Sequence, residues 1–229
     1  MTHMPTVLIG EKSSVELGIV MLHGYAMQPE DLSPFAYSLG VPGRYLFPRG
    51  PWPVPGGGFG WWPVDEERRS ASLAVGPRDL AGEHPAARAP ARSALAGLLK
   101  ELREGSVQRL VVAGFSQGGM LACDTLLHEE VRVDGLALLS SSRLAIAEWH
   151  QQRDRLAGLP VMVAHGSQDT DLAFSAGQAL HDWLRDSGAC TRWVPFDGGH
   201  QIPLPVWREF RKFVRNIAQA KPAHGGTLI

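Results

Sequence analysis

The chain has 229 residues, of which 44% are hydrophobic, and this composition suffices for a buried core within a single compact domain. Its 22 lysines and arginines nearly balance its 23 aspartates and glutamates, giving a formal net charge of -1. Such a balance provides no concentrated positive field, so neither nucleic acid nor an anionic membrane is expected as the main partner.

The chain also lacks the usual signs of secretion, disulfide bonding or zinc binding. Two cysteines, Cys123 and Cys190, are too few for a disulfide framework and are not spaced as zinc ligands. Residues 1–10 show no basic segment followed by an apolar run, and no apolar stretch approaches the roughly 20 residues of a membrane helix. We therefore expect a cytoplasmic protein without integral membrane association. The sequence leaves open whether it forms a homodimer.

Short apolar runs that are typical of strands buried on both faces recur along the chain, at 17–22, 44–47, 110–113, 136–139 and 161–164. Segments with helical spacing of apolar residues occupy 95–102 before Gly105, 174–184 before Gly188, and 206–217 after Pro205. Strands that alternate with helices predict a mostly parallel sheet with helices on both faces.

Two stretches do not fit this alternation. Residues 48–63 are dense in Pro, Gly and Trp, and residues 76–90 are dense in Ala, Pro and charge. We expect both to be loops outside the sheet. The Gly and Pro content of residues 221–229 predicts a flexible tail, and no linker divides the 229 residues into two domains.

The segment Gly114-Phe115-Ser116-Gln117-Gly118-Gly119 follows one apolar run and precedes a helix-compatible segment. It contains Gly-X-Ser-X-Gly between a strand and a helix, the context in which a sharp turn lifts a serine oxygen above a sheet. Small neighbours are needed because the turn is strained and crowded. Ser116 is therefore the candidate nucleophile.

A serine hydroxyl needs a base, and the base is oriented by an acid. The strand at 159–164 is followed by a turn with Asp169, the preferred acid, and Asp171 is its nearest rival. A later loop carries His200, the preferred base. The order Ser116, Asp169, His200 is the order of an α/β-hydrolase. His165 is expected to be a structural residue at the end of its strand.

An acyl-transfer site also needs donors for the oxyanion, typically the backbone N–H after the nucleophile and one from a loop after an early strand. Gln117 supplies the first donor. Gly24 permits a tight turn after the run 17–22, so the backbone N–H of Tyr25 is the second candidate. His23 is expected to brace this loop rather than to take part in catalysis.

At these residues the sequence resembles the phospholipase/carboxylesterase family of α/β-hydrolases, which includes acyl-protein thioesterases and small bacterial carboxylesterases. The resemblance rests on Leu22-His23-Gly24, on 114–119, on His165-Gly166-Ser167-Gln168-Asp169 and on Gly199-His200. It implies little or no cap domain, and it gives Ser116, Asp169 and His200 the roles of nucleophile, acid and base. Tyr25 and Gln117 are implied as oxyanion donors.

The chain departs from the family pattern at two places, of which the first concerns the second oxyanion donor and the second concerns the substrate pocket. Many members carry a small turn with Gly and Asp after His-Gly, whereas this chain continues with Tyr25-Ala26-Met27-Gln28. The family often has a loop ending in Trp and another aromatic residue that line the pocket, and Trp61-Trp62 matches it loosely. Phe59, Trp61 and Trp62 are therefore candidate pocket residues. The alternative is a surface loop whose tryptophans pack into the core.

These features predict a serine carboxylesterase that hydrolyses short- to medium-chain carboxylic esters through an acyl-enzyme intermediate, with a small ester as its partner and without a cofactor or metal. No Lys-Ser/Thr follows Gly56-Gly57-Gly58, so a phosphate-binding loop is not expected. The alternatives are an acyl-protein thioesterase or lysophospholipase acting on long acyl chains, an aminopeptidase or acyltransferase on the same scaffold, and a non-catalytic binding protein.

Overall fold

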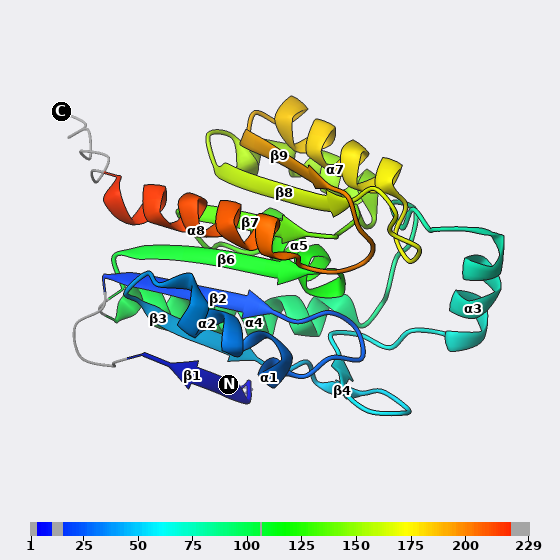
Figure 1. Ribbon diagram of the computed structural model, residues 1–229, viewed down its shortest axis with the longest axis horizontal. Coiled ribbons are helices and arrows are strands. Elements are labelled where there is room, and N and C mark those ends of the chain that lie inside the picture. Colours follow the sequence, from blue (N-terminus) through cyan, green and yellow to red (C-terminus); the bar gives the residue numbers. More distant parts are fainter. Residues whose placement is uncertain (1–3, 11–15, 106, 221–229) are drawn as a thin grey trace.

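The computed structural model describes residues 4–10, 16–105 and 107–220, and its centre is a seven-stranded sheet (Figure 1). The strand order is β1-β3-β2-β6-β7-β8-β9. The strands are β1 (Thr6–Ile9), β2 (Leu17–Leu22), β3 (Arg44–Pro48), β6 (Arg109–Phe115), β7 (Gly135–Leu139), β8 (Pro160–Gly166) and β9 (Cys190–Phe196). All neighbouring pairs are parallel except β1 with β3. The predicted tail at 221–229 lies outside the described residues.

Helices cover both faces of this sheet, as predicted. They are α1 (Pro29–Leu32), α2 (Pro34–Leu39), α4 (Arg88–Glu104), α5 (Gln117–His128), α6 (Ile146–Gln151), α7 (Phe174–Asp186), α8 (Leu204–Gln219) and the 3-10 helix η1 (Arg153–Leu156). Among these described helices, none combines the length and the apolar character needed to cross a bilayer.

Each strand sends alternate side chains into two separate cores. In β2, Val20 and Leu22 pack on the face covered by α4, α5 and α7, while Ile19 and Met21 pack on the face covered by α1, α2 and α8. This alternation follows from the two-residue period of a strand. Because both faces are apolar, the strand has no polar positions, which is why the continuous run at 17–22 predicts it.

All five predicted strands are present, the predicted helices are α4, α7 and α8, and the helix-compatible segment after Ser116 is α5. The edge strand β1 was not predicted. Its four residues are all only partly buried, and the strand pairs on one side only, with β3. The expected loop at 48–63 contains a two-stranded hairpin, β4 (Trp52–Pro53) with β5 (Phe59–Gly60). The expected loop at 76–90 ends at Arg88, where α4 begins.

One helix, α3 (Glu66–Val75), was not predicted, and Figure 1 shows it standing apart from the layers. It has no buried residue, so the apolar periodicity that signals a core helix is missing. Its start is capped by Asp65, whose carboxylate accepts a hydrogen bond from the backbone N–H of Arg68 at 3.0 Å. This single helix is a small addition to the sheet rather than a cap domain.

Candidate active site

Ser116 occupies the sharp turn between β6 and α5, at the carboxyl end of the sheet. Its backbone has φ 53° and ψ -118°, a conformation that non-glycine residues rarely adopt. A Cβ added at Gly118 would lie 2.5 Å from the carbonyl oxygens of both Leu22 and His23. A Cβ at Gly114 would lie 2.4 Å from the backbone of Gly118. The glycines of the sequence segment therefore let the turn pack directly against the end of β2.

The structure brings Asp169 and His200 together beside this turn. His200 Nδ1 lies 2.7 Å from Asp169 Oδ2, and the other carboxylate oxygen of Asp169 accepts the backbone N–H groups of Asp171 and Leu172, both at 2.9 Å. Burial alone raises the pKa of Asp169, but the hydrogen bond and charge of His200 together with these N–H groups outweigh it and lower the pKa. The carboxylate is therefore ionised and can hold the His200 ring with Nδ1 as its donor, which leaves Nε2 free to accept a proton.

Asp171, the rival acid, faces other partners. Its carboxylate accepts hydrogen bonds from the guanidinium groups of Arg69 and Arg78. Burial raises the pKa of Asp171, but these two arginines outweigh it and lower the pKa. Only Asp169 of the two carboxylates contacts His200 in the structure.

The other two histidines of the predicted segments, His23 and His165, are buried and contact backbone groups. His23 Nδ1 lies 2.7 Å from the carbonyl oxygen of Gly24, and its Nε2 accepts the N–H of Gly50 at 3.0 Å. His165 Nε2 lies 3.0 Å from the carbonyl oxygen of Leu172. Burial is the largest cause that lowers the pKa of both rings, so each is neutral. These contacts match the bracing role expected of His23 and the structural role expected of His165.

Both residues expected from the sequence as oxyanion donors lie at the cavity that holds Ser116. Gln117 is the first residue of α5, and the first N–H groups of a helix have no acceptor within the helix. Tyr25 follows the turn at His23-Gly24, and both Tyr25 and Gln117 line the cavity that holds Ser116. The positive end of the α5 dipole lies at the same place and favours a developing negative charge.

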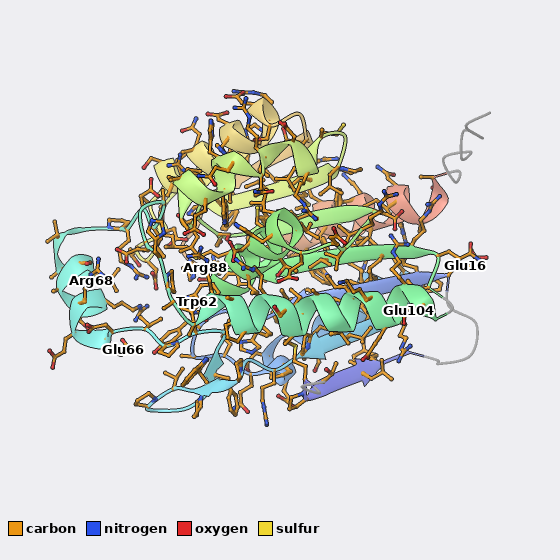
Figure 2. All side chains as sticks on the ribbon, turned by 180° about the vertical axis from the view of Figure 1, so that it is seen from behind. Glu16, Trp62, Glu66, Arg68, Arg88 and Glu104 are labelled. Atoms are coloured by element: carbon orange, nitrogen blue, oxygen red, sulfur yellow. The ribbon has the colours of Figure 1, made fainter. Side chains whose placement is uncertain are left out.

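Ser116 and His200 both line a cavity of about 520 Å³. Its apolar lining residues are Met27, Trp62, Pro63, Val64, Leu80, Pro85, Phe115, Met120, Leu144 and Leu172, and its polar ones are Tyr25, Asp65, Arg68, Arg69, Ser72, Arg78, Glu83, His84, Gln117 and Asp171. Figure 2 shows Glu66 and Arg68 on α3, set apart from Trp62 and from Arg88 at the start of α4. The cavity thus lies between α3 and the carboxyl end of the sheet.

Of the three candidate pocket residues, only Trp62 lines this cavity. Trp61 is fully buried in the core, where its ring stacks on His23 and its Nε1 donates to the carbonyl oxygen of His23 at 2.8 Å. Phe59 pairs with Met27 and packs under the guanidinium of Arg49. The buried side chain of Gln117 fixes the tryptophan backbone, because it accepts from the N–H of Trp61 at 2.8 Å and donates to the carbonyl oxygen of Trp62 at 3.2 Å. Both tryptophans thus pack into the core, with Trp61 0% and Trp62 4% exposed, and Trp62 in addition lines the cavity.

The charged wall of the cavity was not predicted from the sequence. Arg69 and Arg78 belong to the unpredicted α3 and to the segment after it, and no motif marks them. The structure brings these two arginines to the site through Asp171, which lies in the same turn as Asp169 and accepts hydrogen bonds from both.

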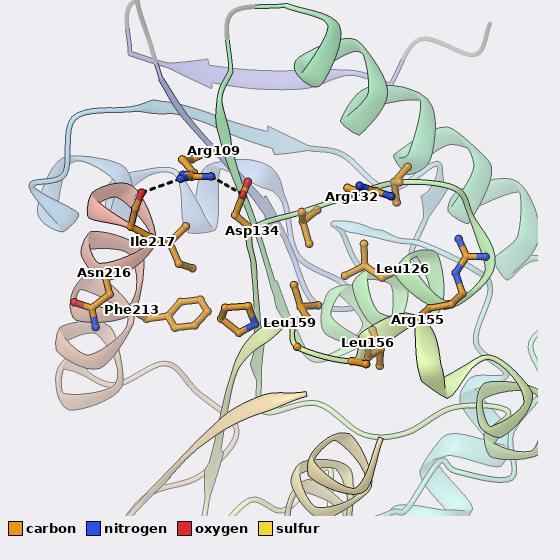
Figure 3. A pocket seen from close by; sticks show the side chains of 16 residues that line it. Arg109, Leu126, Arg132, Asp134, Arg155, Leu156, Leu159, Phe213, Asn216 and Ile217 are labelled. Atoms are coloured by element: carbon orange, nitrogen blue, oxygen red, sulfur yellow. Dashed lines mark hydrogen bonds and ion pairs between the residues drawn. The ribbon is translucent and has the colours of Figure 1, made fainter. Parts of the chain in front are cut away.

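A second cavity, of about 560 Å³, lies at the opposite ends of the strands (Figure 3). Arg109 begins β6 and Pro160 begins β8, so this cavity is at the amino end of the parallel strands. Arg109 contacts Asp134 at 3.2 Å and the carbonyl oxygen of Ala220 at 2.8 Å. None of the predicted site residues lines it, whereas parallel sheets place their ligand sites at the carboxyl end.

Within the described ranges, no group of three or more His, Cys, Asp or Glu side chains is placed to hold a metal ion.

Comparison with known proteins identifies the family of this sequence. A family model described as Phospholipase/Carboxylesterase matches residues 94–218. The putative hydrolase MhqD of Bacillus subtilis is 32% identical over 94 residues, which are 41% of this chain and 46% of that protein. Acyl-protein thioesterase 1 of Neurospora crassa is 29% identical over 110 residues, which are 46% of this chain and 45% of that protein. The chain spans about half the length of the curated relatives it matches.

Among solved structures, the crystal structure of esterase PE8 superposes with a TM-score of 0.76 at 22% identity, over 94% of this chain and 98% of that one. This likeness confirms the predicted α/β-hydrolase fold. The family model covers more than half of the sequence, including the serine turn, the acid turn and the histidine loop. The chain therefore belongs to the phospholipase/carboxylesterase family of α/β-hydrolases.

Proposed function

We propose that this protein is a serine carboxylesterase that hydrolyses short- to medium-chain carboxylic esters through an acyl-enzyme intermediate, with Ser116, Asp169 and His200 as its catalytic triad. The observation that carries the proposal is the hydrogen bond of His200 to Asp169 at the wall of the cavity that also holds Ser116. We also propose that the chain is one domain, because the helices of the described residues other than α3 cover the faces of one seven-stranded sheet.

The proposed reaction uses this chain's own groups. His200 Nε2 accepts the hydroxyl proton as Ser116 Oγ attacks the ester carbonyl carbon, and the N–H groups of Tyr25 and Gln117 donate to the oxyanion. Asp169 stabilises the imidazolium that forms. The ester C–O bond then breaks, and His200 returns its proton to the departing alkoxide. Water attacks the acyl-enzyme with the same proton transfers, which releases the carboxylic acid and restores Ser116.

The preference for short to medium chains is supported by the cavity wall. Six of its side chains carry charge: Asp65, Arg68, Arg69, Arg78, Glu83 and Asp171. A long acyl chain needs a continuous apolar groove, because burying charged groups against hydrocarbon is costly. The second candidate is a thioesterase or lysophospholipase acting on long chains, which is favoured by the apolar lining of Trp62, Leu80 and Leu144 and by the name of the thioesterase relative.

Three measurements test the proposal. A fluorophosphonate probe should add its mass at Ser116, and Ser116→Ala should lose ester turnover by several orders of magnitude. Ser38→Ala, at an exposed serine of α2, is the matched control and should retain turnover. A series of 4-nitrophenyl esters from acetate to laurate then gives the chain-length preference. Turnover that survives in Ser116→Ala contradicts the triad, and a maximum at laurate favours the long-chain candidate.

A further inference from the structure

Two arginines share one carboxylate in the wall of the cavity. Arg69, from α3, and Arg78, from the segment after it, both donate to Asp171. The side chains of all three are mostly buried, with exposed fractions of 27%, 16% and 19%. Two guanidinium groups on one carboxylate leave an excess positive charge on this part of the wall.

The other charged groups of the wall do not cancel this excess. Arg68 and Glu83 form a pair of their own at 2.6 Å, and both are exposed to solvent. Asp65 accepts the N–H of Arg68 as the cap of α3. Glu66, which does not line the cavity, forms a longer ion pair with Arg69 at 3.7 Å and is also exposed. Interactions between exposed charges are screened by solvent, so these groups affect the buried arginines weakly.

The backbone holds Arg78 in place. Its N–H donates to the carbonyl oxygen of Asp171, and its own carbonyl oxygen accepts the N–H of Ala173, both at 2.9 Å. Arg78 is thereby fixed to the turn that carries Asp169. A guanidinium has five N–H donors in a planar fork, of which Asp171 uses only a part, so further donors remain for a second carboxylate.

We propose that Arg69 and Arg78 bind a carboxylate of the substrate, so that this site prefers esters that carry a negative charge over neutral esters of the same shape. This inference rests on the proposed esterase function and names its substrate class. The negative charge of Asp171 repels a substrate carboxylate that binds the remaining N–H donors of the same two arginines. Removing the charge of Asp171 should therefore strengthen the preference, whereas removing either arginine should weaken it.

The test measures kcat/KM for two pairs of matched esters, because the charge can lie on either side of the scissile bond. The first pair carries it on the acyl chain: the mono-4-nitrophenyl ester of adipic acid against the same ester of adipic acid monoamide. The second pair carries it on the leaving group: 4-acetoxybenzoate against 4-acetoxybenzamide. The ratio of charged to neutral ester within a pair is the readout, since both members use the same triad.

We expect the natural protein to favour the charged ester about tenfold in at least one pair, the effect of one charge-assisted hydrogen bond. The ratio should fall toward one in Arg69→Gln and Arg78→Gln, rise in Asp171→Asn, and fall at high salt. Arg103→Gln is the matched control, because Arg103 and its partner Asp134 are 28% and 21% exposed and Arg103 does not line this cavity. Its ratio should stay at the natural value.

A natural ratio near one in both pairs overturns the inference. So does an equal loss for charged and neutral esters in all three variants, which is the result expected if Arg69, Arg78 and Asp171 only support the fold. Either outcome leaves the proposed esterase intact, since the neutral esters are still hydrolysed. Failure of every ester together with no fluorophosphonate adduct at Ser116 contradicts the esterase itself.

Discussion

Asp169 and Asp171 lie in the same turn after β8, yet their carboxylates bind different partners. Asp169 contacts His200 at 2.7 Å, while Asp171 is held by Arg69 and Arg78. The two residues are linked by one hydrogen bond, from the backbone N–H of Asp171 to Asp169 Oδ1. Since this link uses the backbone of Asp171, it survives a change of the Asp171 side chain.

The first prediction separates these two acids. Asp169→Asn should lower kcat for a neutral ester by about 10⁴-fold, because the amide favours the wrong imidazole tautomer and cannot stabilise the imidazolium. Asp171→Asn should lower kcat by less than about tenfold, because Asp171 lines the cavity but does not contact His200. Steady-state turnover of 4-nitrophenyl butyrate measures both. The reverse order of effects would make Asp171 the acid.

The second prediction concerns the strain at Ser116. Its φ of 53° costs a residue with a Cβ about 1–3 kcal/mol, which glycine does not incur. Ser116→Gly should therefore be more stable to urea unfolding than Ser116→Ala by about 1 kcal/mol, after allowing for the larger unfolded-state entropy of glycine. Both variants lack the hydroxyl, so the comparison isolates the backbone. Equal midpoints in the two variants would show that the turn is not strained.

The third prediction concerns the space at Gly118. Gly118→Ala places a Cβ 2.5 Å from two backbone carbonyl oxygens and should destabilise the protein by about 2–4 kcal/mol. Gly97→Ala is the matched change, because nothing lies within 4 Å of its added Cβ in α4. It should stabilise the protein by about 0.5–1 kcal/mol. Urea unfolding measures both, and a neutral Gly118→Ala would contradict the close packing of the serine turn on β2.

Sequence patterns predict the parts of this fold that depend on local periodicity. The runs at 17–22 and 161–164 are strands because every position is apolar, and both faces of the sheet are covered. The helix α3 has no buried residue, and polar contacts such as that of Arg69 with Asp171 connect it to the body. Nothing in its local sequence indicates where it packs.

The site shows the same contrast between residues that a local pattern marks and residues placed by long-range contacts. The serine turn and the two loops after β8 and β9 have distinctive residue types at fixed positions, so Ser116, Asp169 and His200 can be chosen from the sequence. Trp61 and Trp62 are neighbours of the same type and both are buried, but only Trp62 of the two lines the cavity. The backbone of both is held by hydrogen bonds of the Gln117 side chain, which lies 55 positions away from Trp62. Long-range contacts of this kind leave no local pattern.

The last prediction concerns His23, whose pKa is lowered mainly by burial. The ordinary pKa of a histidine is 6.5, so below this pH the unfolded chain binds a proton that the folded protein excludes. Stability is fully present above pH 6.5 and is lost as the pH falls from there through the lowered folded pKa. His23→Gln removes this proton and should reduce the slope of unfolding free energy against pH by up to about 1.4 kcal/mol per pH unit in that window.

Urea unfolding on both sides of the window measures this slope. His84→Gln is a suitable control, since His84 is an exposed histidine whose ring contacts Glu148 at 3.1 Å. Loss of the His23 brace should also lower stability at neutral pH, because the N–H of Gly50 then lacks its buried acceptor. The pH slope and the neutral-pH loss are separate readouts. An unchanged slope in His23→Gln would mean that His23 is protonated in the folded protein, in which case its Nε2 could not accept from Gly50.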